Sequence, residues 1–187
     1  APRTVSRCRP NATCSIGSEL AVLRETARFV LGSDLDEVRL AMARHNLGPE
    51  VALCRADALQ PISRDAVVLL DPARRSGSRR RFDPRAYTPP LDGLLDSYRG
   101  RATVIKVAPG IGFAALAGLG FDGEIEVISL GGSVREACLW SSPLAEPGVR
   151  RRATLLDRDE MLTDADPDDG DVAPPGRWIV DPDGAVV

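Results

Sequence analysis

Apolar residues recur along the chain first at helical spacing and then in short unbroken runs. Leu20, Leu23 and Ala27 predict a helix that Ser18 caps at its start, and a strand over 29–32 follows. The alternation continues with a helix that Asp36 caps and that carries Val38 and Met42 along one side. We then expect strands over 51–55, 66–70 and 102–107, and helices over 91–98 and 111–119. The first two thirds of the chain therefore read as repeated strand and helix units.

Beyond residue 119 the apolar pattern predicts strands alone, over 125–130, 137–141 and 151–156. Alternating strands and helices build parallel sheets with right-handed crossovers. The helix-free end indicates strands that are added in the antiparallel direction. The predicted fold class is α/β, with a mostly parallel central sheet flanked by helices and antiparallel strands at one edge.

The strand over 66–70 runs directly into a small polar segment. Its unbroken apolar sequence is typical of a strand that is covered on both faces. Pro72 then stops the strand ladder because it has no N–H group, so the chain turns at Asp71. Ligands of open α/β sheets lie at the carboxyl ends of the strands. Asp71, followed by Arg74 and Arg75, therefore predicts a site for a polar or anionic ligand; the alternative is a solvated charge run at a strand end.

Length and composition favour a single domain with a short appendage. The chain has 187 residues, 43% of them hydrophobic, which suffices for one good core. Its apolar runs are far shorter than the roughly 20 residues that a membrane span needs, and its first residues lack the apolar core of a signal peptide. We therefore expect a soluble cytoplasmic protein. Four cysteines without CxxC pairing and one histidine predict free thiols and no metal site.

The net charge of -3 hides two segments of opposite sign. Residues 71–85 carry six arginines against two aspartates, whereas residues 157–171 carry eight acids against one arginine. The basic segment could meet phosphates, and the acidic one is typical of a solvated linker. We expect a main domain over 1–156, an acidic linker over 157–175 and, over 176–187, the start of a truncated C-terminal module.

Four motifs, one before the first predicted helix and three after the predicted strands over 29–32, 51–55 and 66–70, together resemble a class I S-adenosylmethionine-dependent methyltransferase over roughly residues 10 to 156. They are Cys14-Ser15-Ile16-Gly17, Asp34, Asp57 and Asp71-Pro72. The resemblance implies a Rossmann-like methyltransferase fold that binds S-adenosylmethionine. In that family the turn after the first strand approaches the cofactor, which here implies Thr13, Ser15 and Gly17. It also implies that Asp34 accepts hydrogen bonds from the ribose hydroxyls and that Asp57 contacts the adenine amino group.

The resemblance also implies roles on the acceptor side. Asp71-Pro72-Ala73 is similar to the Asp-Pro-Pro turn of nucleic-acid methylases, in which the carboxylate and the proline carbonyl hold the hydrogens of an exocyclic amine. Methyl transfer from a sulfonium depends mainly on positioning, so Asp71 and Pro72 are the expected catalytic residues. Arg74 and Arg75 would pair with phosphate; the alternative is a solvated turn or ion pairs with Asp83 and Asp92.

The same loop holds two aromatic residues, and a lone lysine lies in the next predicted strand. Phe82 and Tyr87 are candidates for base stacking. Lys106 is either a strand residue whose ammonium reaches solvent or a substrate contact near the cofactor.

A narrower resemblance is carried by five motifs: Thr-Cys-Ser-Ile-Gly, Gly-Ser-Asp-Leu-Asp, Asp-Pro-Ala-Arg-Arg, Lys-Val-Ala-Pro-Gly and Arg-Glu-Ala-Cys-Leu-Trp-Ser. It is to an actinobacterial type of methyltransferase with a C-terminal THUMP-like domain. THUMP domains bind RNA, so RNA is the favoured substrate, methylated at a nucleobase amine.

Two alternatives stay open. Asn11, Thr13 and Ser15 stand where the family pattern has an aspartate and glycines, which also suits a catalytically degenerate Rossmann-like module that binds RNA or a partner. The other alternative is a small-molecule or protein methyltransferase. The sequence leaves the oligomeric state open.

Overall fold

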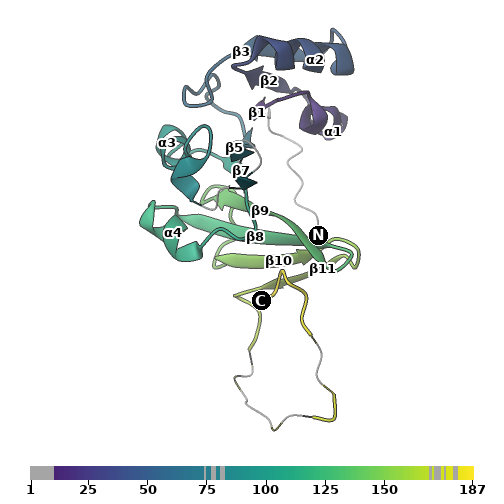
Figure 1. Ribbon diagram of the computed structural model, residues 1–187, viewed down its shortest axis with the longest axis vertical. Helices are drawn as coiled ribbons and strands as arrows, with labels where there is room; N and C mark the ends of the chain where they lie inside the picture. Colours follow the sequence, from purple (N-terminus) through teal and green to yellow (C-terminus); the bar gives the residue numbers. More distant parts are fainter. Residues whose placement is uncertain are drawn as a thin grey trace.

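A mixed sheet forms the centre of the computed structural model (Figure 1), which describes residues 11–73, 75–76, 79–80, 83–168, 170, 174, 176–178 and 181–187. Within this part of the chain the sheet has nine strands in the order β11-β10-β8-β9-β7-β4-β1-β2-β3. Their bounds are β1 (Asn11–Thr13), β2 (Leu31–Asp34), β3 (Ala52–Arg55), β4 (Val68–Leu70), β7 (Thr103–Val107), β8 (Gly123–Leu130), β9 (Ser133–Ser141), β10 (Arg151–Leu155) and β11 (Glu160–Thr163).

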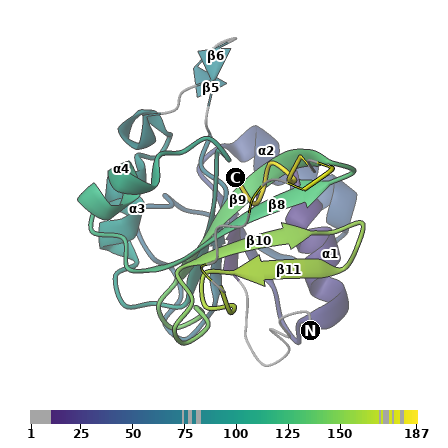
Figure 2. The same cartoon turned by 90° about the horizontal axis from the view of Figure 1, so that it is seen from below.

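The remaining elements connect these strands. They are the helices α1 (Ser18–Thr26), α2 (Glu37–Leu47), α3 (Leu91–Ser97) and α4 (Phe113–Gly118), the 3-10 helix η1 (Pro84–Ala86), and the short strands β5 (Arg75–Ser76) and β6 (Arg79–Arg80). Figure 2 shows α1 and α2 on one side of the sheet and α3 and α4 on the other. The predicted fold class is therefore confirmed in its layers, with helices flanking a central sheet.

Strand direction changes along the sheet. Five consecutive strands of the sheet run parallel to one another, in the order β7, β4, β1, β2 and β3. By contrast, β9 is antiparallel to both β7 and β8, β10 is parallel to β8, and β11 is antiparallel to β10. The predicted combination of a mostly parallel sheet with antiparallel strands at one edge is thus confirmed.

Several predicted bounds need correction. The helix after the first turn is capped by Gly17 rather than Ser18, and Ser18 is its first residue. Asp36 does cap α2, because its carboxylate accepts hydrogen bonds from the N–H groups of the next turn. The apolar side predicted for α2 is exposed, at 63% for Val38 and 50% for Met42, and the helix buries Ala43 and Leu47 instead.

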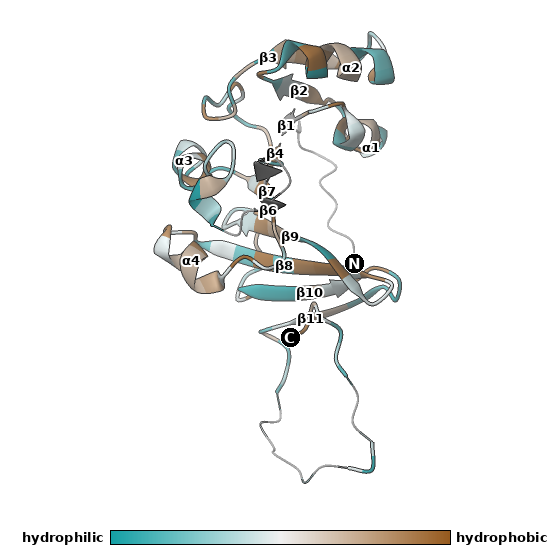
Figure 3. Ribbon diagram, in the orientation of Figure 1, coloured by the Kyte–Doolittle hydropathy of each residue, from teal (hydrophilic) through white to brown (hydrophobic). Residues whose placement is uncertain are grey.

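Two buried clusters lie on the two sides of the sheet. The larger one joins β4, β7, β8 and β9 to α3 and α4, and it contains Val68, Leu70, Tyr87, Leu91, Leu94, Tyr98, Ile105, Val107, Ile111, Leu116, Ile125, Ala137 and Leu139. The smaller one surrounds β1 to β3 beneath α1 and α2, and it contains Cys14, Leu20, Val30, Ala43, Leu47 and Val51. In Figure 3 parts of α2 are nevertheless coloured hydrophobic on the outer edge of the molecule, in agreement with the exposed apolar side chains there.

The sheet continues past the boundary predicted at residue 156. Strand β11 lies inside the expected linker and pairs with β10. Near the end of the chain Ala185 is buried, and Gly184 lies so close to β9 that a Cβ there would come within 3.1 Å of Val134. The division into a domain, a linker and a further module stays a prediction. No helix in the described part of the chain is long and apolar enough to cross a membrane.

Candidate functional site

A pocket of about 1340 Å³ lies at the carboxyl ends of the parallel strands. Five of the predicted site residues line it, namely Ser15, Asp34, Asp57, Asp71 and Pro72. They come from the turn after β1 and from the ends of β2, β3 and β4. These four strands are consecutive in the sheet, in the order β4, β1, β2 and β3. Residues that are far apart in the sequence are thus brought together where open α/β sheets hold their ligands.

Asp34, the last residue of β2, is fixed by the turn that follows it. The N–H of Asp36 donates to its Oδ1 over 2.9 Å, and the guanidinium of Arg39 lies 4.0 Å from its Oδ2. The Asp34 side chain is only 12% exposed. This carboxylate is therefore held in one orientation at the pocket wall, where it can accept hydrogen bonds.

Asp57 follows β3 and is oriented in a similar way. Its Oδ1 accepts a hydrogen bond of 2.9 Å from the N–H of Leu59, which is the geometry by which aspartates stabilise turns. Leu59 and the neighbouring Ala58 also line the pocket and pack against the larger cluster. The pocket therefore has an apolar surface next to the Asp57 carboxylate.

The segment after β4 is closed at its base by backbone hydrogen bonds. Ala73 and Thr88 exchange two of them, of 2.9 and 3.0 Å, so the loop between them starts and ends at the same point. Pro72 is buried, whereas Asp71 is exposed on the pocket side. Asp71 and Pro72 are thus held at the mouth of the pocket independently of the rest of the loop.

Tyr87 does not lie where base stacking would place it. Its side chain is 2% exposed, and its hydroxyl accepts a hydrogen bond of 3.1 Å from the N–H of Ala108 at the end of β7. It therefore joins the loop to the core, and the stacking interpretation is wrong for this residue. Phe82 lies outside the described residues.

The turn after β1 is shorter than the sequence pattern indicates. Asn11 and Thr13 lie within β1 rather than in the turn, which spans only residues 14–17. Ser15 has a φ of 42°, a conformation that L residues rarely adopt. Gly17 has a φ of 96°, and a Cβ there would come within 2.7 Å of Leu47. Gly17 thus lies against α2 and is not among the residues that line the pocket.

Burial makes two of the cysteines poor nucleophiles. Desolvation, together with the charge of Asp34, raises the pKa of the Cys14 thiol to about 11. Desolvation likewise raises the pKa of the Cys138 thiol to about 12, with Glu136 as the next contributor. Three of the four cysteines predicted to be free thiols are so, namely Cys14, Cys54 and Cys138; Cys8 lies outside the described residues. Among the described residues no group of three or more metal-binding side chains is placed to hold an ion.

Of the two predicted phosphate-binding residues, Arg74 and Arg75, the structure describes only the backbone of Arg75. Arg74 is outside the described residues, and Arg75 begins the hairpin of β5 and β6, which projects from the body of the molecule in Figure 2. Arg85, at the far end of the same loop, lies 3.8 Å from Asp92 of α3. For Arg74 and Arg75 themselves, both phosphate binding and the alternatives to it stay predictions.

The main residues that the sequence prediction missed surround Lys106. Its ammonium lies 3.1 Å from Oε2 of Glu136 and 3.6 Å from Oε1 of Glu19, so it does not simply extend into solvent. The sequence feature that could have pointed to this cluster is a charged residue inside an otherwise apolar strand. Its partners could be found only from the packing of α1 and β9 against β7.

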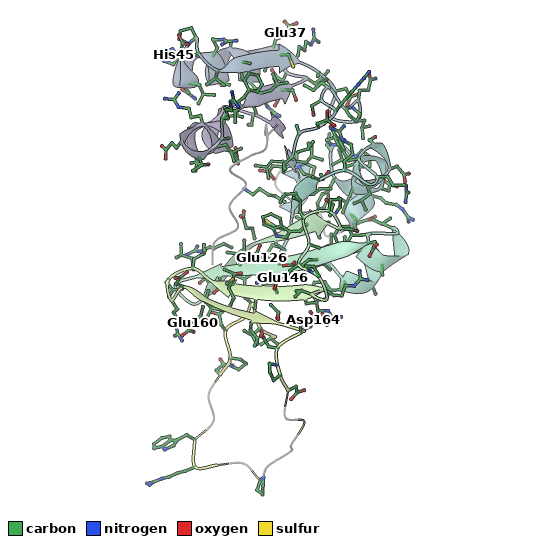
Figure 4. The ribbon with its side chains drawn as sticks, turned by 180° about the vertical axis from the view of Figure 1, so that it is seen from behind. Glu37, His45, Glu126, Glu146, Glu160 and Asp164 are labelled. Atoms are coloured by element: carbon green, nitrogen blue, oxygen red, sulfur yellow. The ribbon has the colours of Figure 1, made fainter. Side chains whose placement is uncertain are left out.

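A second, partly buried polar network joins β8, β9 and β10, and none of its residues lines the pocket. Arg152 donates to Glu124 over 2.7 Å and also pairs with Glu146, and the indole of Trp140 donates to Glu126 over 2.7 Å. Figure 4 shows Glu126 and Glu146 in the lower half of the molecule, whereas Glu37 and His45 mark α2 at the top. Because its charges and polar groups have partners, we assign this network to the packing of β8 to β10.

Two curated relatives match the whole chain. They are described as an uncharacterized S-adenosylmethionine-dependent methyltransferase, one from each of two strains of Mycobacterium tuberculosis, CDC 1551 / Oshkosh and H37Rv. Each is 62% identical over 190 residues, which cover 100% of this chain and 53% of the relative. The chain thus spans about half the length of the curated relatives it matches. No protein-family model matches it.

Solved structures show the same fold at low identity. A proposed methyltransferase of Porphyromonas gingivalis W83 matches 81% of this chain and 41% of its own length, with a TM-score of 0.60 and 18% identity. Magnesium protoporphyrin IX methyltransferase of Synechocystis PCC 6803, solved with bound S-adenosylmethionine, matches 73% of this chain and 70% of its own, with a TM-score of 0.50 and 15% identity. The chain therefore has the Rossmann-like α/β fold of class I methyltransferases.

Proposed function

We propose that this chain forms the S-adenosylmethionine-binding domain of a methyltransferase whose acceptor is an amine, with RNA as the favoured acceptor molecule. The observation that carries the proposal is the single pocket in which the turn after β1 meets the carboxylates that follow β2, β3 and β4. The curated relatives that carry this activity in their name add support.

The donor side of the pocket, which we define as Ser15, Asp34 and Asp57, suits this cofactor. Asp34 and Asp57 are hydrogen-bond acceptors that neighbouring N–H groups have already oriented, so they can bind ribose hydroxyls and an adenine amino group with little loss of side-chain freedom. Five carboxylates and two guanidinium groups line the pocket, which favours a ligand of net positive charge. When bound, the cofactor supplies an electrophilic methyl group on a sulfonium.

The acceptor side, which we define as Asp71 and Pro72, supplies positioning. The Asp71 carboxylate and the Pro72 carbonyl accept hydrogen bonds from the two hydrogens of an amine, which aligns its lone pair for attack. Such alignment contributes most of the rate when little acid or base help is needed. The excess of carboxylates keeps phosphates out of the pocket, so the amine enters while the backbone of the acceptor stays at the rim.

RNA is favoured by what adjoins the acceptor side. Arg74 and Arg75 follow Pro72 after one intervening alanine, and four further arginines occur before residue 86. Arginines beside a pocket that excludes phosphate would contact the nucleic-acid backbone outside it. A C-terminal THUMP-like module, implied by the resemblance, would add further RNA contacts.

Calorimetry of the full-length protein with S-adenosylmethionine tests the donor side. We expect saturable binding that Asp34→Ala weakens at least tenfold, because ribose hydroxyls lose a pre-oriented acceptor. Asp96→Ala is the matched control, since Asp96 pairs with Arg99 on the exposed surface of α3. No measurable binding by the wild-type protein would contradict the enzyme and favour a degenerate RNA- or partner-binding module.

Transfer of tritium from labelled cofactor tests the acceptor. The full-length protein is incubated with total RNA, with a protein lysate and with a metabolite extract, and we expect label in RNA only. Asp71→Ala should abolish the transfer while cofactor binding remains. Label that enters protein or metabolites instead would overturn the RNA assignment and leave the methyltransferase assignment standing.

A further inference from the structure

Lys106 is the only lysine of the chain, and carboxylates from three separate elements surround its ammonium. Nζ lies 3.1 Å from Oε2 of Glu136, 3.6 Å from Oε1 of Glu19 and 3.9 Å from Oδ2 of Asp71. The lysine side chain is 21% exposed. Glu19 lies in the first turn of α1, Asp71 follows β4 and Glu136 lies on β9.

The register of the sheet explains why these groups converge. Ile105 and Val107 contribute to the larger cluster, so Lys106 between them faces the opposite side of the sheet, where α1 packs. Leu70 pairs with Ile105, which places Asp71 beside Lys106. On the other neighbour, Cys138 pairs with Lys106, and Glu136 lies two residues along the same face.

The electrostatics keep the ammonium charged. Burial alone would lower the pKa of Lys106, but the hydrogen bond and charge of Glu136, followed by the charges of Asp71 and Glu19, raise the pKa above its usual value. Of the three carboxylates only that of Glu136 lies within hydrogen-bond distance of the ammonium, and those of Glu19 and Asp71 act on it through their charge at 3.6 and 3.9 Å. Because the lysine projects from a central strand, its partners are held against a rigid element.

We propose that Lys106 is a positioning residue: its ammonium holds the Asp71 carboxylate at the acceptor side and links it, through Glu19, to the helix that follows the donor-side turn. The inference rests on the proposed function and extends it. Both Glu19 and Asp71 line the pocket, so one cation connects the two sides. Lys106 acts through Asp71 and needs no contact of its own with the acceptor.

Kinetics of the full-length protein test this role. For Lys106→Met we expect kcat for tritium transfer into RNA to fall 10- to 100-fold, while the Kd for S-adenosylmethionine stays within threefold of wild type. Lys106→Arg should recover at least a third of the activity, because a guanidinium can also bridge carboxylates. Arg99→Met, which removes an exposed cation just after α3, is the matched control and should change neither value. An unchanged kcat in Lys106→Met, or an equal loss of cofactor affinity, would overturn the proposal.

Nuclear magnetic resonance tests the contact without any acceptor. In protein labelled with 13C at lysine, the Cε signal missing from Lys106→Arg belongs to Lys106. Asp71→Asn should shift that signal and lower the pH at which it titrates, because a neighbouring negative charge is removed; Asp96→Asn should do neither. An Asp71→Asn protein with an unaltered Lys106 signal would refute the positioning role even if the enzyme is active. If the wild-type protein transfers tritium to none of the three preparations, RNA, protein lysate or metabolite extract, that result refutes the proposed function instead.

Discussion

The two halves of the sheet are packed to different extents. The half around β4, β7 and β9 has thirteen residues in one buried cluster, whereas the half around β1 to β3, which carries the donor side, has six. In the smaller cluster the side chains pack directly against the backbone of β2 at Gly32. A Cβ on Gly32 would come within 2.4 Å of Leu20 and 2.9 Å of the Cβ of Cys14. We infer that packing and cofactor binding are coupled in the smaller half and separable in the larger one.

Truncation of one core leucine in each half should give the largest effect. Leu20 and Leu139 are both fully buried, so either change to alanine should lower the free energy of unfolding by about 2–5 kcal/mol. Leu20→Ala should also weaken S-adenosylmethionine binding, because Leu20 packs beneath the turn after β1, and Leu139→Ala should not. Urea denaturation and calorimetry measure the two quantities. Equal cofactor affinity in both variants would remove the distinction between the halves.

Gly32→Ala tests the close approach directly. The added methyl group has no space among Leu20, Leu53 and Cys14, so we expect a loss of about 1–3 kcal/mol in stability together with weaker cofactor binding. Gly118→Ala is the control, because a Cβ at this last residue of α4 meets nothing within 4 Å. Thermal unfolding should show no loss of stability for the control. A stable Gly32→Ala protein would mean that the smaller half adjusts more easily than its packing indicates.

The cap of α2 should give a smaller effect. Oδ1 of Asp36 accepts hydrogen bonds from the N–H groups of Val38 and Arg39 over 2.8 and 3.3 Å. Asp36→Ala removes both and should lower the free energy of unfolding by about 1 kcal/mol. Asp36→Asn keeps an acceptor oxygen and should remain close to wild type in denaturant titrations. A wild-type midpoint for Asp36→Ala would show that packing alone holds this helix.

The pH dependence of stability allows a comparison of one buried thiol from each half. Near neutral pH, the contribution of these thiols to the free energy of unfolding should be the smallest of the predicted effects. The pKa of Cys14 is raised from 9.0 to about 11, and that of Cys138 to about 12. Between pH 9 and these values the unfolded chain has lost protons that the folded chain retains, so stability should fall as pH rises. We expect the loss between pH 8 and pH 10 to be smaller in Cys14→Ala and in Cys138→Ala than in wild type. Identical losses in all three proteins would assign the pH dependence to other groups.

The sequence predicted best those features that depend on local pattern. The short apolar runs located most strands to within two residues, and the carboxylates directly after them, Asp34, Asp57 and Asp71, do line one pocket. Their assigned roles remain predictions. Local pattern also located the cap of α2, because Asp36 binds N–H groups of its own turn.

Features that depend on contacts between distant segments were not predicted. The residues of β1, Asn11–Thr13, have little strand character of their own. They form a central strand because they pair with β2 on one side and β4 on the other. The same holds for β11, whose acidic sequence indicated a linker. Gly17 looked like a ligand-binding glycine, but its small size serves the contact with Leu47.

The backbone pair between Ala73 and Thr88 joins the two ends of the loop after Asp71, and Tyr87 anchors the second end in the core. The outer part of the loop, which carries the hairpin of β5 and β6, can therefore change in length and sequence at little cost to the residues at its base. Such a loop can be exchanged as a unit between related proteins. Acceptor recognition could therefore diverge in evolution, or be redesigned by grafting, while the pocket beneath it stays the same.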